Sequence, residues 1–411
     1  MVMFPLYIDP GTGSALFSIA IGITAAVYFL ARAFFLKFGV LIFRRKNLSD
    51  SKYKYVIYAE DKRYWSLFHP VLREFESRKT DVLYLTTSND DPVFSSGYTH
   101  VNGKYIGQGN RAFAYLNFLS ASFLLTTTPE LDVMQWKRSK TVGHYCHYIH
   151  GAGGSLLYRL FSLDYFDSIL VPGEVEIQEI RALEQARKLP EKQIVVAGNT
   201  FFDECTEKIK NISPEQEHRF TVLVAPSWGP ASLLQVYGEK LLNPLVRTGW
   251  RIIVRPHPQS AIAEKKTLEK LTALYAENPN VEWDYSHDNI HTLAKADVMI
   301  SDFSGVVYDY AFLFDRPVMV NTQDLDFRRL DAGNVQQAPY YFRAFQKTGI
   351  ELDNTKLDSL ADAITAMTGD GELAEKLRKN RREAKDTMWQ YRGEAGKRIV
   401  DFMIKTVNGE V

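Results

Sequence analysis

The chain has 411 residues, 45% of them hydrophobic, and its 49 basic side chains balance 49 acidic ones, so the formal net charge is zero. This length exceeds what one ordinary core fills and suits two α/β domains with an appendage. Zero net charge gives no overall case for nucleic-acid binding, so any phosphate recognition must be local. The two cysteines, Cys146 and Cys205, show neither zinc spacing nor a disulfide framework, which indicates buried apolar side chains.

The N-terminal segment is unusually apolar. No charged residue occurs between Asp9 and Arg32, and residues 13–31 approach the roughly 20 apolar residues that a spanning helix needs. A basic cluster at 44–46 follows this stretch, and no basic residue precedes it, which favours a cytoplasmic location for the rest of the chain. The sequence therefore predicts a single-pass anchor in the cytoplasmic membrane over residues 1–46; a helix buried in a globular domain is the alternative.

Strand and helix patterns then alternate up to residue 210. Short apolar runs predict strands at 55–58, 82–85, 123–126, 142–148, 168–171 and 193–196. Helical patterns are predicted at 63–76, 109–118, 155–161 and 175–188. Such alternation is typical of a parallel sheet. Residues 198–203 are predicted to form a turn between domains.

The alternation restarts after a polar stretch at 211–218. Further strands are predicted at 220–225, 251–254, 298–300 and 318–320. Helices are predicted at 233–247, 261–278, 357–368, 372–391 and 394–407, with another ending at residue 314. We therefore predict an α/β chain of two tandem Rossmann-like, doubly wound domains, 47–210 and 211–411, behind the membrane helix. In such sheets ligands bind at the carboxyl ends of strands, so the cleft between the domains is the expected site.

His150 ends one predicted strand and precedes a glycine-rich turn that contains Gly151 and Gly153. Glycines let backbone N–H groups approach a phosphate, and the start of a helix favours an anion. An imidazole at this point can act as a general base near neutral pH. The alternative is a structural turn with a hydrogen-bonded histidine, and this motif alone does not decide between them.

Arg255 and His257 lie in the sequence RPHP, which ends another predicted strand. The two prolines stiffen the turn and remove N–H donors. A cation and an imidazole held in this way suit a pyrophosphate group. The alternative is a proline-locked loop with incidental side chains.

A third junction contains Ser301, Asp302, Ser304, Gly305 and Asp309. Hydroxyls and the N–H groups at a helix start can hold phosphate oxygens. The carboxylate at 302 would repel phosphate and is predicted to orient a neighbouring group. Ordinary helix capping is the alternative explanation.

A fourth strand-end loop contains Ser227 and Trp228. The indole is predicted either to stack on a base or to close the core. No pair of carboxylates with metal-binding spacing lies in these loops, so the sequence predicts no catalytic metal and no other cofactor.

Taken in this order, the loops resemble those of the CDP-glycerol:polyol-phosphate glycerophosphotransferase family, which builds teichoic-acid-type polymers. The segment Ile300–Val318, ISDFSGVVYDYAFLFDRPV, is similar to the family's SDYSS segment and the residues that follow it. Residues 255–258 resemble its HP motif, 149–151 its WHG motif and 226–228 its PTW motif. The opening YIDPGTGS at 7–14 is similar to that of bacterial members. The lysines that often follow WHG are absent, and glycine stands at 305 where the family has serine.

The resemblance implies a GT-B fold and transfer of an alcohol phosphate from a CDP-activated donor to a hydroxyl of a cell-envelope polymer or membrane lipid, with release of CMP. It implies that His150 activates the acceptor hydroxyl and that His257 stabilises the donor pyrophosphate. The same resemblance places the phosphate oxygens beside Ser301 and Ser304, with Asp302 and Asp309 nearby. Because a fold does not fix a function, two alternatives stay open: a GT-B sugar transferase or epimerase relative, and a non-catalytic membrane scaffold.

Overall fold

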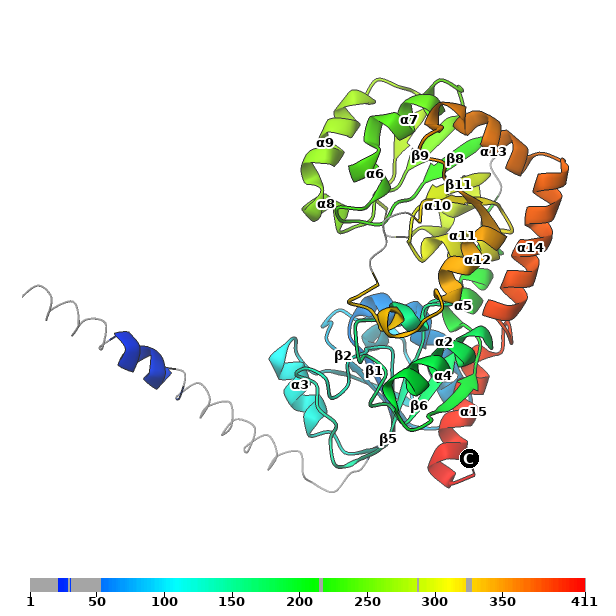
Figure 1. Ribbon diagram of the computed structural model, residues 1–411. Coiled ribbons are helices and arrows are strands. Elements are labelled where there is room, and N and C mark those ends of the chain that lie inside the picture. The colour runs from blue at the N-terminus through cyan, green and yellow to red at the C-terminus, as the bar shows by residue number, and fades with distance from the viewer. Residues whose placement is uncertain are drawn as a thin grey trace, which may run out of the picture. The chain divides into compact units, whose positions relative to one another are not determined.

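The chain divides into two units, Met1–Lys52 and Tyr53–Val411 (Figure 1). The computed structural model describes residues 21–28, 30, 53–213, 217–286, 288–322 and 327–410. The membrane anchor predicted at 1–46 lies almost wholly outside these residues. Within them, none of the helices combines the length and the apolar character needed to cross a membrane.

The second unit contains two parallel sheets, and the first of these has seven strands in the order β3-β2-β1-β4-β5-β6-β7. The strands are β1 (Tyr53–Ala59), β2 (Val82–Thr86), β3 (Val101–Tyr105), β4 (Ala121–Thr126), β5 (Val142–Tyr148), β6 (Ser168–Val171) and β7 (Gln193–Val196). All five residues of β2 and all four of β6 are buried, as expected for strands covered on both faces. The strand order reverses between β1 and β4, and doubly wound sheets bind ligands at such a switch point.

Helices and short helical turns connect these strands. They are η1 (Lys62–Tyr64), α2 (Trp65–Ser77), η2 (Pro92–Ser95), α3 (Asn110–Asn117), η3 (Ser155–Leu157), α4 (Val175–Arg187) and α5 (Thr200–Ile209). The helix predicted at 155–161 is wrong, because the chain forms only the turn η3 before Phe161 adopts a left-handed φ of 71°. The turn predicted at 198–203 is also wrong: the side chain of Asn199 accepts a hydrogen bond from the Phe202 N–H at 3.1 Å and caps α5.

The second sheet has six parallel strands in the order β10-β9-β8-β11-β12-β13. They are β8 (Thr221–Val224), β9 (Arg251–Val254), β10 (Val281–Trp283), β11 (Val298–Ser301), β12 (Val318–Val320) and β13 (Gly349–Glu351). The helical segments around it are α6 (Leu233–Val236), α7 (Gly238–Val246), α8 (Ser260–Ala263), α9 (Lys265–Leu274), α10 (Ile290–Lys295), α11 (Val306–Phe314), η4 (Asp331–Asn334), α12 (Tyr340–Thr348), η5 (Leu357–Ser359), α13 (Leu360–Thr368), α14 (Glu372–Met388) and α15 (Ala395–Asn408). Two helices predicted as continuous, 233–247 and 261–278, are each broken, at Tyr237 and at Glu264.

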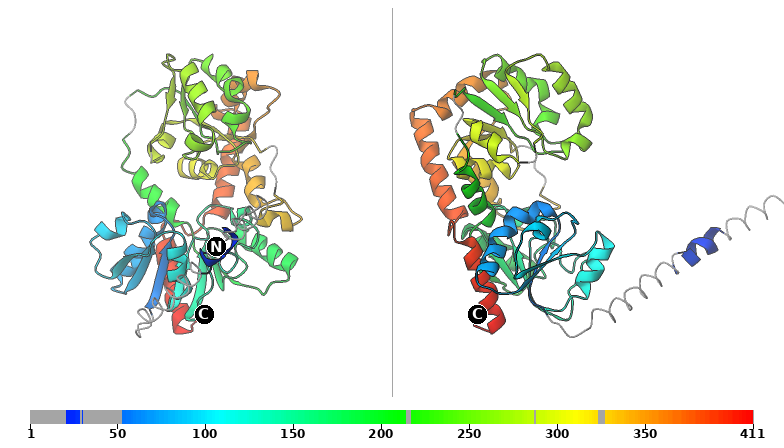
Figure 2. Two further views of the ribbon diagram at one scale, coloured as in Figure 1. Left: turned by 90° about the vertical axis from the view of Figure 1, so that its left-hand side faces the viewer. Right: turned by 180° about the vertical axis from the view of Figure 1, so that it is seen from behind.

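The last helix completes the core of the first sheet, although the sequence assigns it to the second domain. Buried residues of α15, among them Ile399 and Met403, pack in one cluster with β1 and α2 (Figure 2). Gly396 makes this packing close, since a Cβ at that position would lie 2.7 Å from the carbonyl oxygen of Pro70 in α2. The domain division predicted at residue 210 falls between α5 and β8 and stays a prediction.

We expect Gly396→Ala to lower the free energy of unfolding by about 1–3 kcal/mol, because the added methyl group meets rigid backbone. Helix propensity alone predicts the opposite sign, since alanine is favoured over glycine by up to about 1 kcal/mol. The urea midpoint measures the balance. Gly371→Ala is the matched control, because a Cβ there meets no atom within 4 Å, and it should shift the midpoint less. An unchanged or raised midpoint for Gly396→Ala would show that α15 does not pack this closely.

Candidate functional site

A cavity of about 320 Å³ lies where the carboxyl ends of the two sheets approach each other, and we call it the central cavity. Its walls come from η1, α2, the loop after β5, α5, the start of α11 and α12. The lining residues are Arg63, Tyr64, Leu67, His150, Gly151, Ala152, Phe201, Gly305, Val306, Asp309 and Tyr341. Four of the site residues predicted from the sequence therefore face one space: His150, Gly151, Gly305 and Asp309.

His150 is held from two sides. Its Nδ1 lies 2.8 Å from the hydroxyl of Thr127, and its carbonyl oxygen accepts a hydrogen bond from the amide of Asn199 at 3.1 Å. The ring of Tyr64 meets the imidazole edge-on at a centroid distance of 5.7 Å. Burial lowers the pKa of His150 to about 4, so the ring is neutral at physiological pH and able to accept a proton.

Asp309 provides a second titratable group in the central cavity. It lies in the first turn of α11, the helix whose start is formed by Gly305 and Val306. Burial raises the pKa of Asp309 to about 7. This carboxyl therefore changes its charge close to neutral pH, within a cavity that also contains a neutral histidine and a helix N-terminus.

In the glycine-rich turn after His150, most of the backbone N–H groups point into the protein interior. The N–H of Ser155 donates to the carboxylate of Glu176 at 3.1 Å, and the N–H of Gly153 faces the same carboxylate. Gly153 has a φ of 74°, and a Cβ there would lie 2.6 Å from the Met388 side chain. An internal carboxylate thus takes the N–H groups that the sequence assigns to a phosphate, while Gly151 remains on the cavity wall.

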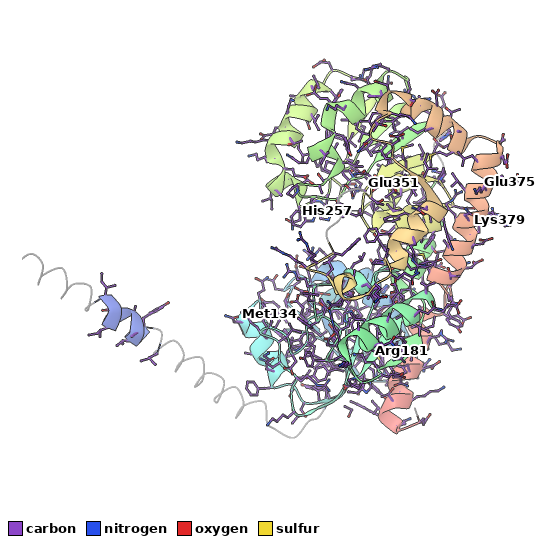
Figure 3. All side chains as sticks on the ribbon, in the orientation of Figure 1. Met134, Arg181, His257, Glu351, Glu375 and Lys379 are labelled. Atoms are coloured by element: carbon purple, nitrogen blue, oxygen red, sulfur yellow. The ribbon has the colours of Figure 1, made fainter. Side chains whose placement is uncertain are left out.

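His257 lies in the loop between β9 and α8 of the second sheet and is labelled in Figure 3. Its Nδ1 accepts a hydrogen bond from the Gln259 N–H at 3.1 Å, so the neutral ring carries its proton on Nε2. Trp228 stacks against the imidazole at a centroid distance of 6.3 Å. Burial lowers the pKa of His257, the carboxylate of Glu264 opposes this shift, and the charge of Arg63 adds to it. Arg63 belongs to the wall of the central cavity.

Arg255 bonds to Asp284 and Ser286 and does not point into the central cavity. Its guanidinium forms an ion pair with Asp284 and donates to the hydroxyl and the carbonyl oxygen of Ser286 at 3.0 and 2.7 Å. Against the effect of burial, hydrogen bonds from Ser286 and Thr292, and then from Arg255, lower the pKa of Asp284 to about 2. This side chain therefore fixes the ends of β9 and β10 to each other, and it does not line the central cavity.

The residues predicted around β11 divide into buried and partly exposed ones. Ser301 is fully buried, and its hydroxyl donates to the carbonyl oxygen of Ala225 at 2.6 Å. Asp302 accepts the N–H groups of Ser227 and Leu233 at 2.7 and 3.2 Å, and burial raises its pKa. The carboxylate at 302 thus holds the loop 226–232 through two backbone N–H groups. Ser304, beside Gly305, is only partly buried.

Glu264 holds the same loop from the other side, a role for which the sequence contains no local signal. Its carboxylate accepts the N–H of Gly229 at 2.9 Å and the hydroxyl of Ser232. Because this residue leaves the helical path to reach the loop, α8 ends there and α9 begins anew. Within the described ranges, no group of three or more His, Cys, Asp or Glu side chains is placed to hold a metal ion.

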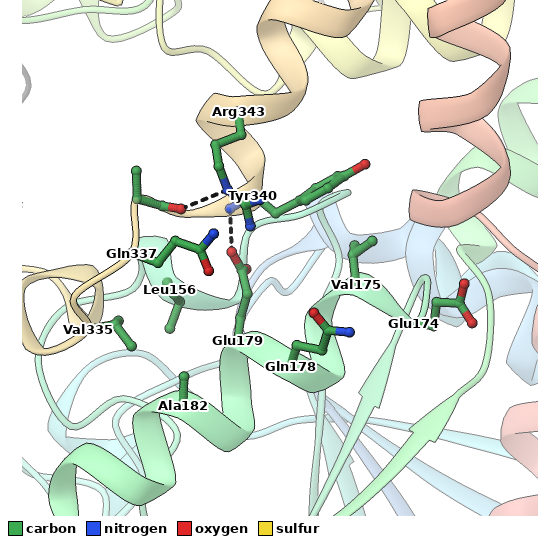
Figure 4. Close-up of a pocket in the computed structure, with 11 residues that line it drawn as sticks. Leu156, Glu174, Val175, Gln178, Glu179, Ala182, Val335, Gln337, Tyr340 and Arg343 are labelled. Carbon is green, nitrogen blue, oxygen red and sulfur yellow. Dashed lines mark hydrogen bonds between the residues drawn. The ribbon is translucent and has the colours of Figure 1, made fainter.

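Helix α4 contains a buried pair of carboxyl groups, Glu176 and Glu179, that no motif of the sequence indicates. Glu179 accepts hydrogen bonds from the Ser155 hydroxyl at 3.1 Å and from the Tyr340 N–H, and it lines a pocket of about 230 Å³ with Arg343 (Figure 4). Burial raises the pKa of both carboxyl groups, and the proximity of Glu179 raises that of Glu176 further. Through its bond to Tyr340, Glu179 joins α4, which follows β6 of the first sheet, to α12, which precedes β13 of the second sheet.

Two parallel sheets with a shared cavity at their carboxyl edges define the class, a GT-B-like α/β transferase fold. The family model of CDP-Glycerol:Poly(glycerophosphate) glycerophosphotransferase matches residues 185–405, which is more than half of the chain. The chain belongs to this family and is an enzyme of the glycerophosphotransferase type. A search of curated protein sequences found no significant match.

Solved structures share the fold at low sequence identity. The wall teichoic acid polymerase TagF has a TM-score of 0.56 at 14% identity, over 93% of this chain and 99% of that one. A TagF variant soaked with CDPG has a TM-score of 0.57 at 14% identity, over 91% and 98%. UDP-GlcNAc 2-epimerase from Neisseria meningitidis, bound to UDP-GlcNAc, has a TM-score of 0.52 at 13% identity, over 86% and 100%. These similarities show the fold.

The carboxyl pair generates a prediction about stability. A carboxyl whose pKa is raised on folding stabilises the fold below its unfolded pKa, and this contribution is lost as the pH rises through the folded value. The thermal midpoint of the wild type should therefore fall between about pH 5 and pH 8.5. Glu176→Gln should flatten this fall, because the amide has no proton to lose. Glu174→Gln is the control, because Glu174 is exposed and lines the pocket that Glu179 also lines, and it should leave the fall in thermal midpoint unaltered. An equal fall in the wild type and both variants would mean that Glu176 and Glu179 are ionised in the folded protein.

Proposed function

We propose that the protein transfers an alcohol phosphate, such as glycerol phosphate, from a CDP-activated donor to an acceptor hydroxyl and releases CMP. The observation that carries this proposal is the arrangement of the central cavity. A neutral histidine, His150, faces the N-terminus of α11 across a space to which both sheets contribute. Family membership supplies the reaction class.

In the proposed reaction, the acceptor hydroxyl donates a hydrogen bond to Nε2 of His150. Nδ1 then carries the ring proton and donates a hydrogen bond to the hydroxyl oxygen of Thr127, 2.8 Å away. This tautomer leaves the lone pair of Nε2 free. As the acceptor oxygen attacks the phosphorus that bears the alcohol, its proton moves to Nε2. The bond from this phosphorus to the bridging oxygen of the pyrophosphate breaks, and CMP leaves with the bond's electrons.

The donor pyrophosphate is assigned to the side of the cavity formed by the second sheet. His257 would donate from Nε2–H, since its Nδ1 already accepts the Gln259 N–H. Ser304 and the N–H groups at the start of α11 would hold phosphate oxygens, because helix N-termini favour anions. Trp228, which is 48% exposed and stacks on His257, would contact the nucleotide.

Asp309 fits this arrangement in its neutral form. Its pKa of about 7 already leaves much of it protonated at neutral pH, and a bound pyrophosphate would raise the pKa further. A protonated carboxyl can donate a hydrogen bond to a phosphate oxygen, whereas the carboxylate would repel it.

We also propose that the reaction takes place at the cytoplasmic face of the membrane, on a lipid or polymer acceptor. The support is the apolar stretch 13–31 with the basic cluster 44–46 behind it, together with the family's role in cell-envelope polymers. The acceptor side is assigned to residues 47–210 and the donor side to 211–411, with α15 returning to the first sheet.

Nucleotide release tests the proposed transfer. Purified protein with a membrane-lipid extract should release CMP from CDP-glycerol or CDP-ribitol. His150→Ala should lower the rate by about 10²–10⁴-fold, the usual contribution of a positioned acid–base group, and His257→Ala should also lower it strongly. His291→Ala, which removes an exposed histidine of α10, is the control and should keep the wild-type rate. Release of UDP or GDP from sugar nucleotides would instead identify a sugar transferase, and wild-type rates in both site variants would refute the assignment.

The pH profile tests Asp309. Below its pKa of about 7 the group is neutral, and above it the charge opposes the donor phosphates. We expect kcat/KM for the CDP-alcohol to fall on the alkaline side with an apparent pKa near 7. Asp309→Asn should remove this limb while preserving much of the rate at pH 6. An alkaline limb that persists in the variant would have to come from another group.

A further inference from the structure

Arg63 brings a positive charge to the central cavity. It lies in η1, the short turn that connects β1 to α2 in the first sheet. Its side chain is 72% exposed, so a ligand in the cavity can reach it. Among the described residues that line this cavity, Arg63 is the one side chain with a permanent positive charge. No motif of the sequence points to this residue.

The basic site residues predicted from the sequence are neutral or already bonded. Burial lowers the pKa of His150 to about 4 and also lowers that of His257, so neither ring carries a positive charge at neutral pH. The guanidinium of Arg255 forms an ion pair with Asp284. A CDP-activated donor brings a negatively charged pyrophosphate, and Arg63 is the cation that remains to meet it.

One carboxylate fixes the position of the Arg63 side chain. Asp61 accepts the backbone N–H of Arg63 at 2.8 Å and its Nε–H at 3.0 Å. Within the described part of the chain, Asp61 is the hydrogen-bond partner of this side chain, and it takes only the donor on Nε. The terminal nitrogens of the guanidinium carry further N–H donors that match phosphate oxygens. Because an ion pair this exposed contributes little, Asp61 orients the guanidinium and leaves it available to a phosphate.

The charge of Arg63 also acts on the second-sheet half. It contributes to the lowered pKa of His257, which lies in the loop after β9. The same cavity wall includes Gly305, at the start of α11, where the helix N-terminus favours an anion. A pyrophosphate bound as proposed, against His257 and the start of α11, therefore lies within the field of Arg63.

We propose that Arg63 is a catalytic residue whose guanidinium binds the donor pyrophosphate from the first-sheet side and stabilises the negative charge that develops on the departing CMP. This role rests on the proposed transfer function. As the bond from phosphorus to the bridging oxygen breaks, its electron pair stays on CMP, and the acceptor proton goes to His150. Arg63 keeps its own protons and contributes hydrogen bonds and charge at the place where charge develops.

Binding of CDP to the full-length protein tests the phosphate contact without turnover. Calorimetric titration with CDP measures the affinity for a nucleotide that has a pyrophosphate, and titration with cytidine measures the affinity for the base and ribose alone. Arg63→Gln should weaken CDP binding roughly tenfold or more and leave cytidine binding unchanged, because a charge-assisted bond to phosphate is lost. Arg63→Lys should give an intermediate affinity, since an ammonium group keeps the charge without the fork of donors.

Lys62→Gln is the matched control. It removes one positive charge from the same turn, but Lys62 forms an ion pair with Asp90 and does not line the central cavity. This variant should keep the wild-type affinity for CDP. Both side chains are exposed, so neither substitution should lower the thermal midpoint appreciably. Equal CDP affinity in the wild type and Arg63→Gln, an equal loss in both variants, or no CDP binding by the wild type overturns the proposal.

Turnover separates this inference from the proposed function. Arg63→Gln should lower kcat/KM for CDP-glycerol roughly 100-fold, as the loss of a group that stabilises developing charge does, whereas Lys62→Gln should keep the wild-type value. Release of CMP at the wild-type rate by Arg63→Gln overturns the inference and leaves the transfer function in place. CDP binding that depends on Arg63, without CMP release from any CDP-alcohol, supports the phosphate contact and overturns the proposed transfer together with the catalytic role.

The pKa of His257 provides a readout that a purely structural role of Arg63 would not change. The charge of Arg63 lowers this pKa, whereas the carboxylate of Glu264 raises it. We therefore expect Arg63→Gln to raise the pKa of His257 and Lys62→Gln to leave it unchanged. NMR titration of histidine-labelled protein measures this pKa, with His257→Gln to assign the signal. An unchanged pKa in Arg63→Gln overturns the placement of the guanidinium on which the inference rests.

Discussion

Parallel strand pairing is the constraint on which the rest of the structure depends. Every strand pair in both sheets is parallel, so each sheet gathers all of its strand-to-helix junctions at one edge. Residues far apart in sequence, such as Tyr64, His150 and Asp309, thereby line one space. The buried, continuous apolar strands supply the stability, and the junctions remain free to vary chemically.

Inside those junctions, carboxyl groups do much of the positioning. Asp302 and Glu264 hold the loop 226–232 from two sides, and Glu176 occupies the N–H groups of the glycine-rich turn. A carboxylate that accepts backbone N–H groups fixes a loop in the same way that a bound anion would. The lysines that often follow the WHG motif in the family are absent here, and in this chain the corresponding turn is ordered by the internal carboxyl group of Glu176.

The sequence predicts the architecture well because long apolar runs and amphipathic helices are strong signals. The strands β1, β2, β4 to β9, β11 and β12 follow from pattern alone, as do the helices α2, α3, α4, α11, α13, α14 and α15. The helices α5, α10 and α12 were not predicted. The three-residue strands β10 and β13 are too short to show a period, and β3, with only its first residue buried, lacks an apolar run. The positions of His150, Gly305 and Asp309 at one cavity follow from the doubly wound rule. Other features depend on contacts between distant segments, which no local pattern contains. They are the ion pair of Arg255 with Asp284, the inward-facing N–H of Gly153, and the buried pair Glu176 and Glu179.

The packing of α15 against the first sheet affects the order in which the protein folds during its synthesis. Residues such as Ile399 and Met403, near the end of the chain, share a core with β1, near its beginning. During synthesis the first sheet is exposed for the whole time that the ribosome needs to complete the second one. The part of its core that Ile399 and Met403 complete can close only after α15 has been synthesised, so the first sheet finishes its packing after the residues of the second sheet have been made.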